Sequence, residues 1–108
     1  MSADVEMQMK QTRRRRALAL KLIRQGHEAQ EDRLNDTMLQ ALMQDAGSNM
    51  SPNQVMTMLQ DLQELNYVKF AQRFDDIRER FVAEQIMLTS LGTILVLRRQ
   101  NNENLLFA

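Results

Sequence analysis

The stretch that decides the fold is residues 51–68, SPNQVMTMLQDLQELNYV. Ser51 is a favourable N-cap, Pro52 suits the first helical position, and Gln54 stands where a capping box requires Glu or Gln. The apolar residues that follow are spaced four, three and three apart, which places them on one side of a helix; they are Val55, Leu59, Leu62 and Leu65. We therefore predict a capped helix that packs through this stripe and leaves its polar side free to contact a partner.

The residues after this helix predict a strand that begins at a tight turn. Asn66 is an acceptable left-handed helix stop where glycine is absent, and residues 67–70 are mostly aromatic and β-branched. Apolar and polar residues then alternate as far as an Asp-Asp pair that suits a turn. Two alternatives remain for residues 77–87: a return strand over residues 81–88, or a helix capped by one of these aspartates. The hairpin is favoured, because a lone strand would leave its backbone groups without partners.

Upstream of this unit, the sequence predicts a long basic helix. Residues 11–25 are rich in strong helix formers and end before Gly26, a suitable helix stop. Residues 1–10 are expected to be either a flexible end or an extension of this helix. The arginines at positions 13–16 point in nearly every direction around a helix axis. We therefore expect this turn to project beyond the body of the domain.

A loop and a short second helix are expected between these two helices. Residues 26–33 are polar and lack periodicity, which predicts a loop. The second helix is expected to begin at Asn35 or Asp36, with inward positions Met38, Leu39 and Leu42. Among the remaining methionines, Met56 is expected to point outward from the third helix.

The last part of the chain predicts a fourth helix and an apolar tail. Thr89 is a good N-cap, and the helix is expected over residues 90–99. Its apolar residues lie on more than one side, and residues 105–107 are apolar as well. We therefore expect a homodimer whose interface includes Leu91, Ile94, Leu95, Leu105, Leu106 and Phe107. The alternative is that the tail folds back on its own domain.

Composition limits the class of protein. The chain has 108 residues, of which 44% are apolar and 26% charged, as is typical of one globular domain. We expect this domain to span residues 11–99, with a tail at 100–108. The absence of cysteine excludes disulfides and thiolate metal sites and fits a reducing cytoplasm. No apolar run approaches the ~20 residues of a membrane span, and the acidic N-terminus lacks the apolar segment of a signal peptide. A cytoplasmic protein without a membrane partner is expected.

The order of these elements resembles a known superfamily. Two helices, SPNQVMTMLQDLQELNYV, a hairpin and then LTSLG opening a helix resemble the winged helix-turn-helix regulators of bacteria and phages. More narrowly, RALALKLI, RLNDTMLQALMQDAG and SPNQVMTMLQDLQELNYV resemble small winged-helix proteins of Mu-like phages and prophages, over about residues 13–97. The resemblance implies a mainly α fold with a small β-hairpin (α+β), a winged helix-turn-helix with an additional C-terminal helix. It also implies a role in transcription regulation. Two features depart from these relatives: Asn66 replaces the usual glycine, and the expected wing is longer.

A DNA-binding function would use the third helix in the major groove. Its exposed residues expected on base edges are Asn53, Gln54, Thr57 and Gln60. Net charge is zero, but seven of the fourteen basic residues lie at positions 10–24 without an intervening acid. Because phosphate contacts supply most non-specific affinity, we expect them from Arg13, Arg14, Arg15, Arg16, Lys21, Arg24, Lys69, Arg73, Arg78 and Arg80.

A second hypothesis is that the chain does not bind DNA. The third helix has no Lys or Arg and carries Asp61 and Glu64, which is unfavourable for contact with DNA. Its polar side would then be only a solvated surface. The chain would be a winged-helix module for protein–protein interaction or assembly, without DNA binding.

The sequence holds no recognisable catalytic arrangement. It lacks a cysteine nucleophile, a Gly-rich phosphate loop and paired carboxylates in a recognisable setting. His27 is the only histidine and has no cysteine neighbours, so no transition-metal site is predicted. The acidic residues at positions 28, 31, 32 and 36 lack the glycine and spacing of a calcium loop. We expect no enzyme activity, no metal, no cofactor and no small-molecule substrate.

Overall fold

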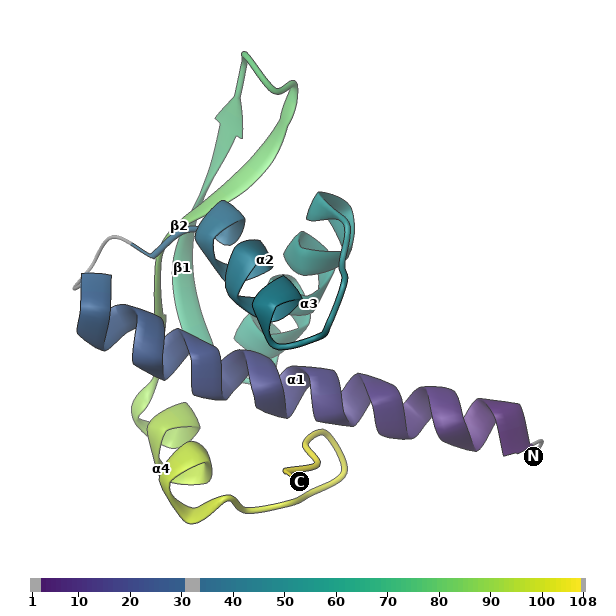
Figure 1. The fold of residues 1–108 in the computed structure, drawn as a ribbon. Helices are drawn as coiled ribbons and strands as arrows, with labels where there is room; N and C mark the ends of the chain where they lie inside the picture. The colour runs from purple at the N-terminus through teal and green to yellow at the C-terminus, as the bar shows by residue number, and fades with distance from the viewer. Residues whose placement is uncertain (1–2, 31–33, 108) are drawn as a thin grey trace.

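The computed structural model of the chain describes residues 3–30 and 34–107, without the side chains of residues 27–30. Over these residues the fold is mainly helical, with a two-stranded antiparallel hairpin and a C-terminal helix, in a winged-helix-like layout (Figure 1). The predicted α+β fold class is therefore confirmed. In chain order the elements are α1 (Ala3–Gln30), α2 (Asp36–Asp45), α3 (Pro52–Glu64), β1 (Val68–Asp75), β2 (Arg80–Leu88) and α4 (Ser90–Arg98). We call the β1–β2 hairpin with its connecting turn the wing.

The helix α1 runs along the length of the molecule. At about 1.5 Å per residue its 28 residues match the longest extent of the fold, 42 Å. The helices α2 and α3 and the wing lie on one side of α1, and α4 with the tail lies on the other (Figure 1). The core lies where these elements meet the middle of α1; its fully buried members include Leu20, Ile23, Leu39, Leu59, Ile86 and Leu105.

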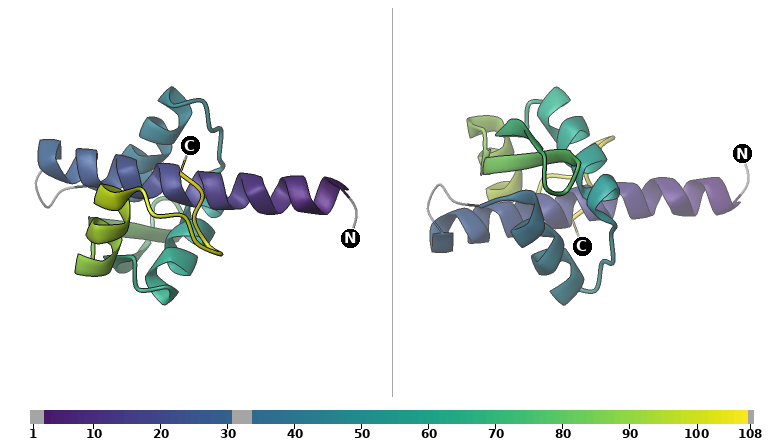
Figure 2. Two further views of the ribbon diagram at one scale, coloured as in Figure 1. Left: turned by 90° about the horizontal axis from the view of Figure 1, so that it is seen from below. Right: turned by 90° about the horizontal axis from the view of Figure 1, so that it is seen from above.

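The N-terminal turns of α1 extend past the body, with Val5, Met7 and Met9 exposed (Figure 2). Of the two alternatives expected for residues 1–10, the described residues form the helix extension. None of the helices over the described residues combines the length and the apolar character needed to cross a bilayer.

The predicted stop at Gly26 is wrong, because α1 continues through it to Gln30. Gly26 is buried, and a Cβ at this position would lie only 3.0 Å from Cδ1 of Leu34. The glycine therefore allows Leu34 to pack closely against the helix instead of ending it. The predicted loop over residues 26–33 is accordingly wrong for 26–30, and residues 31–33 lie outside the described part.

The predicted start of α3 is confirmed. The Ser51 backbone N–H donates to Oε1 of Gln54 at 2.9 Å, and the Gln54 N–H donates to Oγ of Ser51 at 3.2 Å, which completes the capping box. Of the predicted stripe, Val55, Leu59 and Leu62 are fully buried and Leu65 is partly buried.

Of two residues at the end and the edge of α3, one adopts the predicted conformation and the other does not. Asn66 adopts a φ of 64°, the left-handed stop that was predicted. Met56 does not point outward as predicted but belongs to the core. It follows Val55 by about 100° around the helix, at the edge of the apolar stripe, and a flexible thioether can turn inward from there.

The predicted hairpin is confirmed, and the alternative helix over residues 77–87 is wrong. The strands pair antiparallel, with Val68 opposite Leu88 at the base and Asp75 opposite Arg80 near the tip. A bulge interrupts the ladder between Lys69 and Ala71. On the facing strand, beside this bulge, the Ile86 backbone N–H donates to the Leu34 carbonyl at 2.9 Å. The segment before α2 is thereby bonded to the edge of β2.

The helix α4 and the tail close the fold. Thr89 caps α4 as predicted, its Oγ1 accepting the Gly92 N–H at 3.0 Å. Gly92 packs against the Tyr67 carbonyl so closely that a Cβ would collide with it. The tail folds back, with Leu105 fully buried and Phe107 buried. This was the alternative to a tail that forms part of a homodimer interface.

Candidate nucleic-acid interface

The exposed side of α3 presents a line of polar side chains. Asn53, Thr57 and Gln60 are exposed and follow one another at helical spacing, so they share one face. This face, which we call the α3 ridge, lies opposite the buried stripe. At one edge of it, Nε2 of Gln60 donates to Oε1 of Gln72 in β1 at 3.5 Å, which connects the ridge with the wing.

A hollow of about 300 Å³ lies between α1 and α3, and it brings together residues that the sequence separates. Its lining comprises Thr12, Arg15, Arg16, Met50, Asn53, Gln54, Thr57, Met58 and Asp61. Three of the four predicted base contacts therefore share a surface with two of the predicted phosphate contacts. Arg16 Nη2 lies 3.8 Å from Asp61 Oδ2, a loose ion pair that spans the hollow from α1 to α3.

The arginine turn does not project beyond the body, contrary to the prediction. Residues 13–16 lie in the middle of α1, between the tail on one side and α3 on the other, because the helix begins ten residues earlier than Arg13. Arg13 faces the tail: its Nη2 donates to the Asn102 carbonyl at 2.7 Å, and its Nε is buried without a hydrogen bond to any described residue. This arginine is engaged within the chain.

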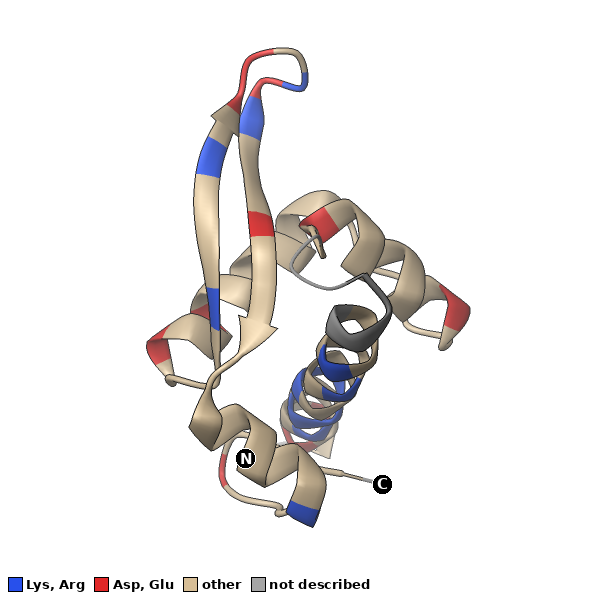
Figure 3. Ribbon diagram, turned by 90° about the vertical axis from the view of Figure 1, so that its left-hand side faces the viewer, with Lys and Arg blue, Asp and Glu red and all other residues tan. Residues whose placement is uncertain are grey.

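The other basic residues of α1 differ in what they contact. Among the described residues, Arg14, Arg15 and Lys21 have no carboxylate partner. Arg14 is exposed, whereas Arg15, Lys21 and Arg24 are half-buried. The band of Lys and Arg along this helix is visible in Figure 3. Of these unpaired cations, Arg15 lines the hollow beside the α3 ridge, whereas Arg14 and Lys21 line a separate hollow with Leu106 and Phe107 of the tail.

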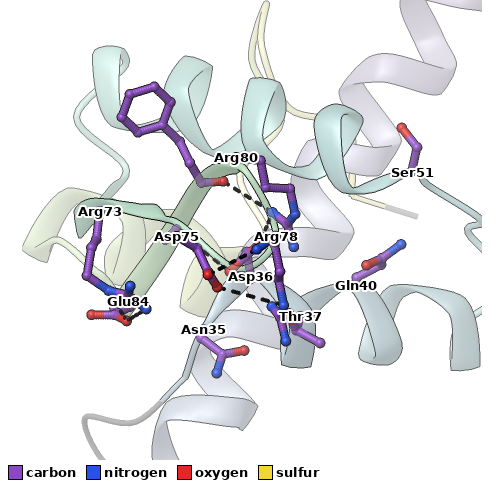
Figure 4. Close-up of polar contacts among 12 residues, drawn as sticks. Asn35, Asp36, Thr37, Gln40, Ser51, Arg73, Asp75, Arg78, Arg80 and Glu84 are labelled. Carbon is purple, nitrogen blue, oxygen red and sulfur yellow. Dashed lines mark hydrogen bonds and ion pairs between the residues drawn. The ribbon is translucent and has the colours of Figure 1, made fainter.

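The three wing arginines predicted to contact phosphate already have carboxylate partners (Figure 4). Arg73 Nη2 lies 2.8 Å from Oε1 of Glu84, and this hydrogen-bonded carboxylate raises the pKa of the arginine. Arg78 pairs more loosely with Asp75, at 3.8 Å, and Arg80 pairs with an acid of α2. Only Lys69 of the predicted wing contacts is exposed without such a partner among the described residues.

The pair between Arg80 and Asp36 joins the wing to α2. Asp36 is 3% exposed; its Oδ2 accepts from Arg80 Nη1 at 2.9 Å, and its Oδ1 accepts the Ala83 N–H at 3.3 Å. The sequence alone suggested Asp36 as a helix cap or a member of an acidic cluster, and Arg80 as a phosphate contact. No local signal could reveal the pair, because 44 residues separate its members.

The residues predicted at a dimer interface divide into two groups. Leu91 and Ile94 are 42% and 44% exposed on α4, and Leu97, which was not predicted, is 59% exposed beside them. Leu95, Leu105 and Phe107 are instead buried by the chain itself, and Leu106 is partly buried. The burial follows from the tail, which lies along α1 through a hydrogen bond from the Leu106 N–H to the Arg13 carbonyl at 3.2 Å.

The tip of the wing carries a second exposed apolar group. Ile77 is 94% exposed, and the rings of Phe74 and Phe81 pack edge to face with centroids 5.3 Å apart. The turn is held by Asp75, whose Oδ1 accepts the N–H groups of Ile77 at 2.9 Å and Arg78 at 3.2 Å. The Arg78 N–H is the main cause of a lowered pKa of Asp75. Sequence periodicity did not single out this tip.

The described residues include no candidate metal site. Among the described residues, no three His, Cys, Asp or Glu side chains lie together in a way that would hold a metal ion. The side chains of His27 and of the residues at 28, 31 and 32 lie outside the described part, so the structure says nothing of them. A scan against protein-family models and a search of curated proteins gave no match.

Proposed function

We propose that this chain binds double-stranded DNA as a small winged-helix protein, with the α3 ridge in the major groove and the basic side of α1 against the phosphates. The observation that carries the proposal is the shared hollow. Arg15 and Arg16 line it together with Asn53 and Thr57, so groups suited to phosphate and groups suited to base edges face the same partner.

The existing contacts of the basic side chains favour some of them over others for binding phosphate. Arg13 faces the tail, Arg16 is paired with Asp61, and the wing arginines 73, 78 and 80 are paired with carboxylates, so each would have to exchange an existing contact for a phosphate. Arg14, Arg15 and Lys21 have no such contact among the described residues and are our assignment for phosphate binding. Base edges would be contacted by Asn53, Thr57 and Gln60, with Gln54 beside them.

The biological role we propose is that of a transcription regulator in the cytoplasm. The resemblance of residues 13–97 to small winged-helix proteins of Mu-like phages and prophages supports this role. A homodimer would place two α3 ridges on one duplex, and the exposed face of α4 offers the surface for it, through Leu91, Ile94 and Leu97.

The test is salt-dependent binding to a short labelled duplex of random sequence, followed by fluorescence anisotropy. Affinity should fall steeply between about 50 and 200 mM salt. Replacing Arg14 and Arg15 together with Ala should reduce the slope of log K against log salt by about 2. Arg98→Ala, which removes an exposed arginine at the end of α4, is the matched control and should leave both affinity and slope unchanged.

Two outcomes would refute the DNA proposal. One is the absence of binding at low salt, and the other is binding that does not respond to ionic strength. A slope that stays the same in the Arg14 and Arg15 double variant would instead assign the phosphate contacts to other residues.

The second candidate is a winged-helix interaction module without DNA binding. Its supporting observation is the exposed apolar face of α4, formed by Leu91, Ile94 and Leu97. This candidate predicts self-association, or association with another protein, in a chain that ignores duplex DNA. Light scattering across a concentration series, with Ile94→Asp as the disrupting variant, would measure the self-association.

A further inference from the structure

The α3 ridge is chemically suited to some bases and not to others. Guanine presents two acceptors in the major groove, which Arg or Lys satisfies, and α3 contains neither residue. Adenine presents an acceptor and a donor, which the amide of Asn or Gln matches with two hydrogen bonds. The exposed amides on or beside the ridge are those of Asn53, Gln54 and Gln60.

Two of these three amides already have hydrogen-bond partners. The oxygen of Gln54 accepts the Ser51 N–H in the capping box, so this amide cannot offer both of its ends to a base. The nitrogen of Gln60 donates to Gln72 of the wing. Asn53 is exposed and makes no side-chain hydrogen bond to any described residue, so both the oxygen and the nitrogen of its amide remain without a partner there.

Asn53 also has a favourable position. It is in the first turn of α3, the end of a recognition helix that contacts base edges. It lines the hollow with Arg15, so a phosphate held by this arginine would lie near the base that Asn53 reaches. Thr57 follows one helical turn later on the same face, where its hydroxyl and methyl groups suit a neighbouring base or a thymine methyl.

On the basis of the proposed DNA binding, we infer that Asn53 selects adenine at one position of each binding site, through a bidentate contact. Thr57 contacts the adjacent step. Gln54 serves the helix start and contributes little to base selection. The preferred sites are accordingly A·T-rich opposite the first turn of α3.

The experiment compares duplexes that differ at one base pair, at constant salt, after selection of a preferred site from a randomised pool. Wild-type protein should prefer adenine at one position by about 5- to 150-fold, the range for a good bidentate pair. Asn53→Ala should lose this preference at that position. Gln63→Ala removes another exposed amide of α3, outside the hollow, and should keep the preference.

A second variant tests the chemistry of the contact. Asn53→Asp keeps the shape of the side chain but removes its donor, and an acid in the first turn is compatible with the helix. Its preference should move from adenine toward cytosine, whose amino group donates in the major groove. Circular dichroism of each variant confirms that a lost preference does not come from unfolding.

The outcomes separate this inference from the function on which it rests. Salt-dependent binding by the wild type without an adenine preference, or a preference that survives Asn53→Ala, overturns the assignment of Asn53 and leaves DNA binding intact. Absence of wild-type binding overturns both.

Discussion

Replacing Leu105 with Ala tests whether the tail is part of the domain. Leu105 is fully buried, and truncation of such a leucine costs about 3–5 kcal/mol where the surroundings cannot collapse. Because the tail can detach from the domain, the free energy of unfolding can fall by no more than the free energy with which the tail docks. We therefore expect a decrease of about 3 kcal/mol. With a urea m-value of about 1.5 kcal/mol/M, the unfolding midpoint should fall by about 2 M.

The chain offers an internal probe for this experiment. Tyr67 is its only tyrosine, and there is no tryptophan. The Tyr67 hydroxyl accepts from Nδ2 of Asn102 at 3.2 Å and of Asn104 at 3.4 Å, so its fluorescence reports the docked tail. In Leu105→Ala this signal should change before the global transition seen by circular dichroism.

The control for Leu105→Ala is the truncation of a leucine that the fold leaves exposed. Leu97→Ala truncates a leucine that is 59% exposed and should change the free energy of unfolding by no more than about 0.5 kcal/mol. A Leu105→Ala variant as stable as the wild type, with an unchanged tyrosine signal, would refute the packing of the tail. A loss of stability that depends on protein concentration would show that a second copy, and not the same chain, buries Leu105.

Three further predictions concern stability. Gly92→Ala should lower the free energy of unfolding by about 2 kcal/mol, because the added Cβ would collide with the Tyr67 carbonyl. The higher helix propensity of alanine offsets only part of this loss. An unchanged melting temperature would contradict the prediction. Asp36→Ala should lower the free energy of unfolding, measured in urea, by about 2–3 kcal/mol. The reason is that Arg80 loses its carboxylate partner and the Ala83 N–H of β2 loses its acceptor. A decrease below about 0.5 kcal/mol would be inconsistent with the buried pair. The pKa of Asp75 is lowered on folding, so its contribution to stability is present above the ordinary value of 3.8 and is lost as the pH falls below it. An NMR titration of the Asp75 carboxyl that gave a value at or above 3.8 would contradict this assignment.

The parts of the fold that sequence could predict depend on short-range chemistry. The capping box of Ser51 and Gln54 and the left-handed Asn66 each follow from residues within a few positions of one another. The hairpin was predicted from the alternation of apolar and polar residues, and because a lone strand leaves its backbone groups without hydrogen-bond partners. In these places, local preference and tertiary packing agree.

The errors arise where tertiary packing decides. Gly26 has the character of a helix stop, but the contact with Leu34 uses its missing side chain inside a continuous helix. Met56 turns into the core from the edge of a stripe. The candidate site was predicted only as two separate sets of residues, base contacts on α3 and phosphate contacts on α1 and the wing. Their common hollow depends on how the two helices cross, which no spacing along the chain encodes.

The concentration of basic residues on α1 affects how this molecule would meet a charged polymer. Half of the Lys and Arg residues lie between positions 10 and 24, while the whole chain is neutral (Figure 3). A neutral molecule whose positive and negative charges are separated has a dipole moment. A distant polyanion therefore exerts mainly a torque on the molecule and little net attraction. Such a torque would turn α1 toward the polymer before the surfaces touch. Added salt would therefore slow productive encounters by randomising the angle of approach.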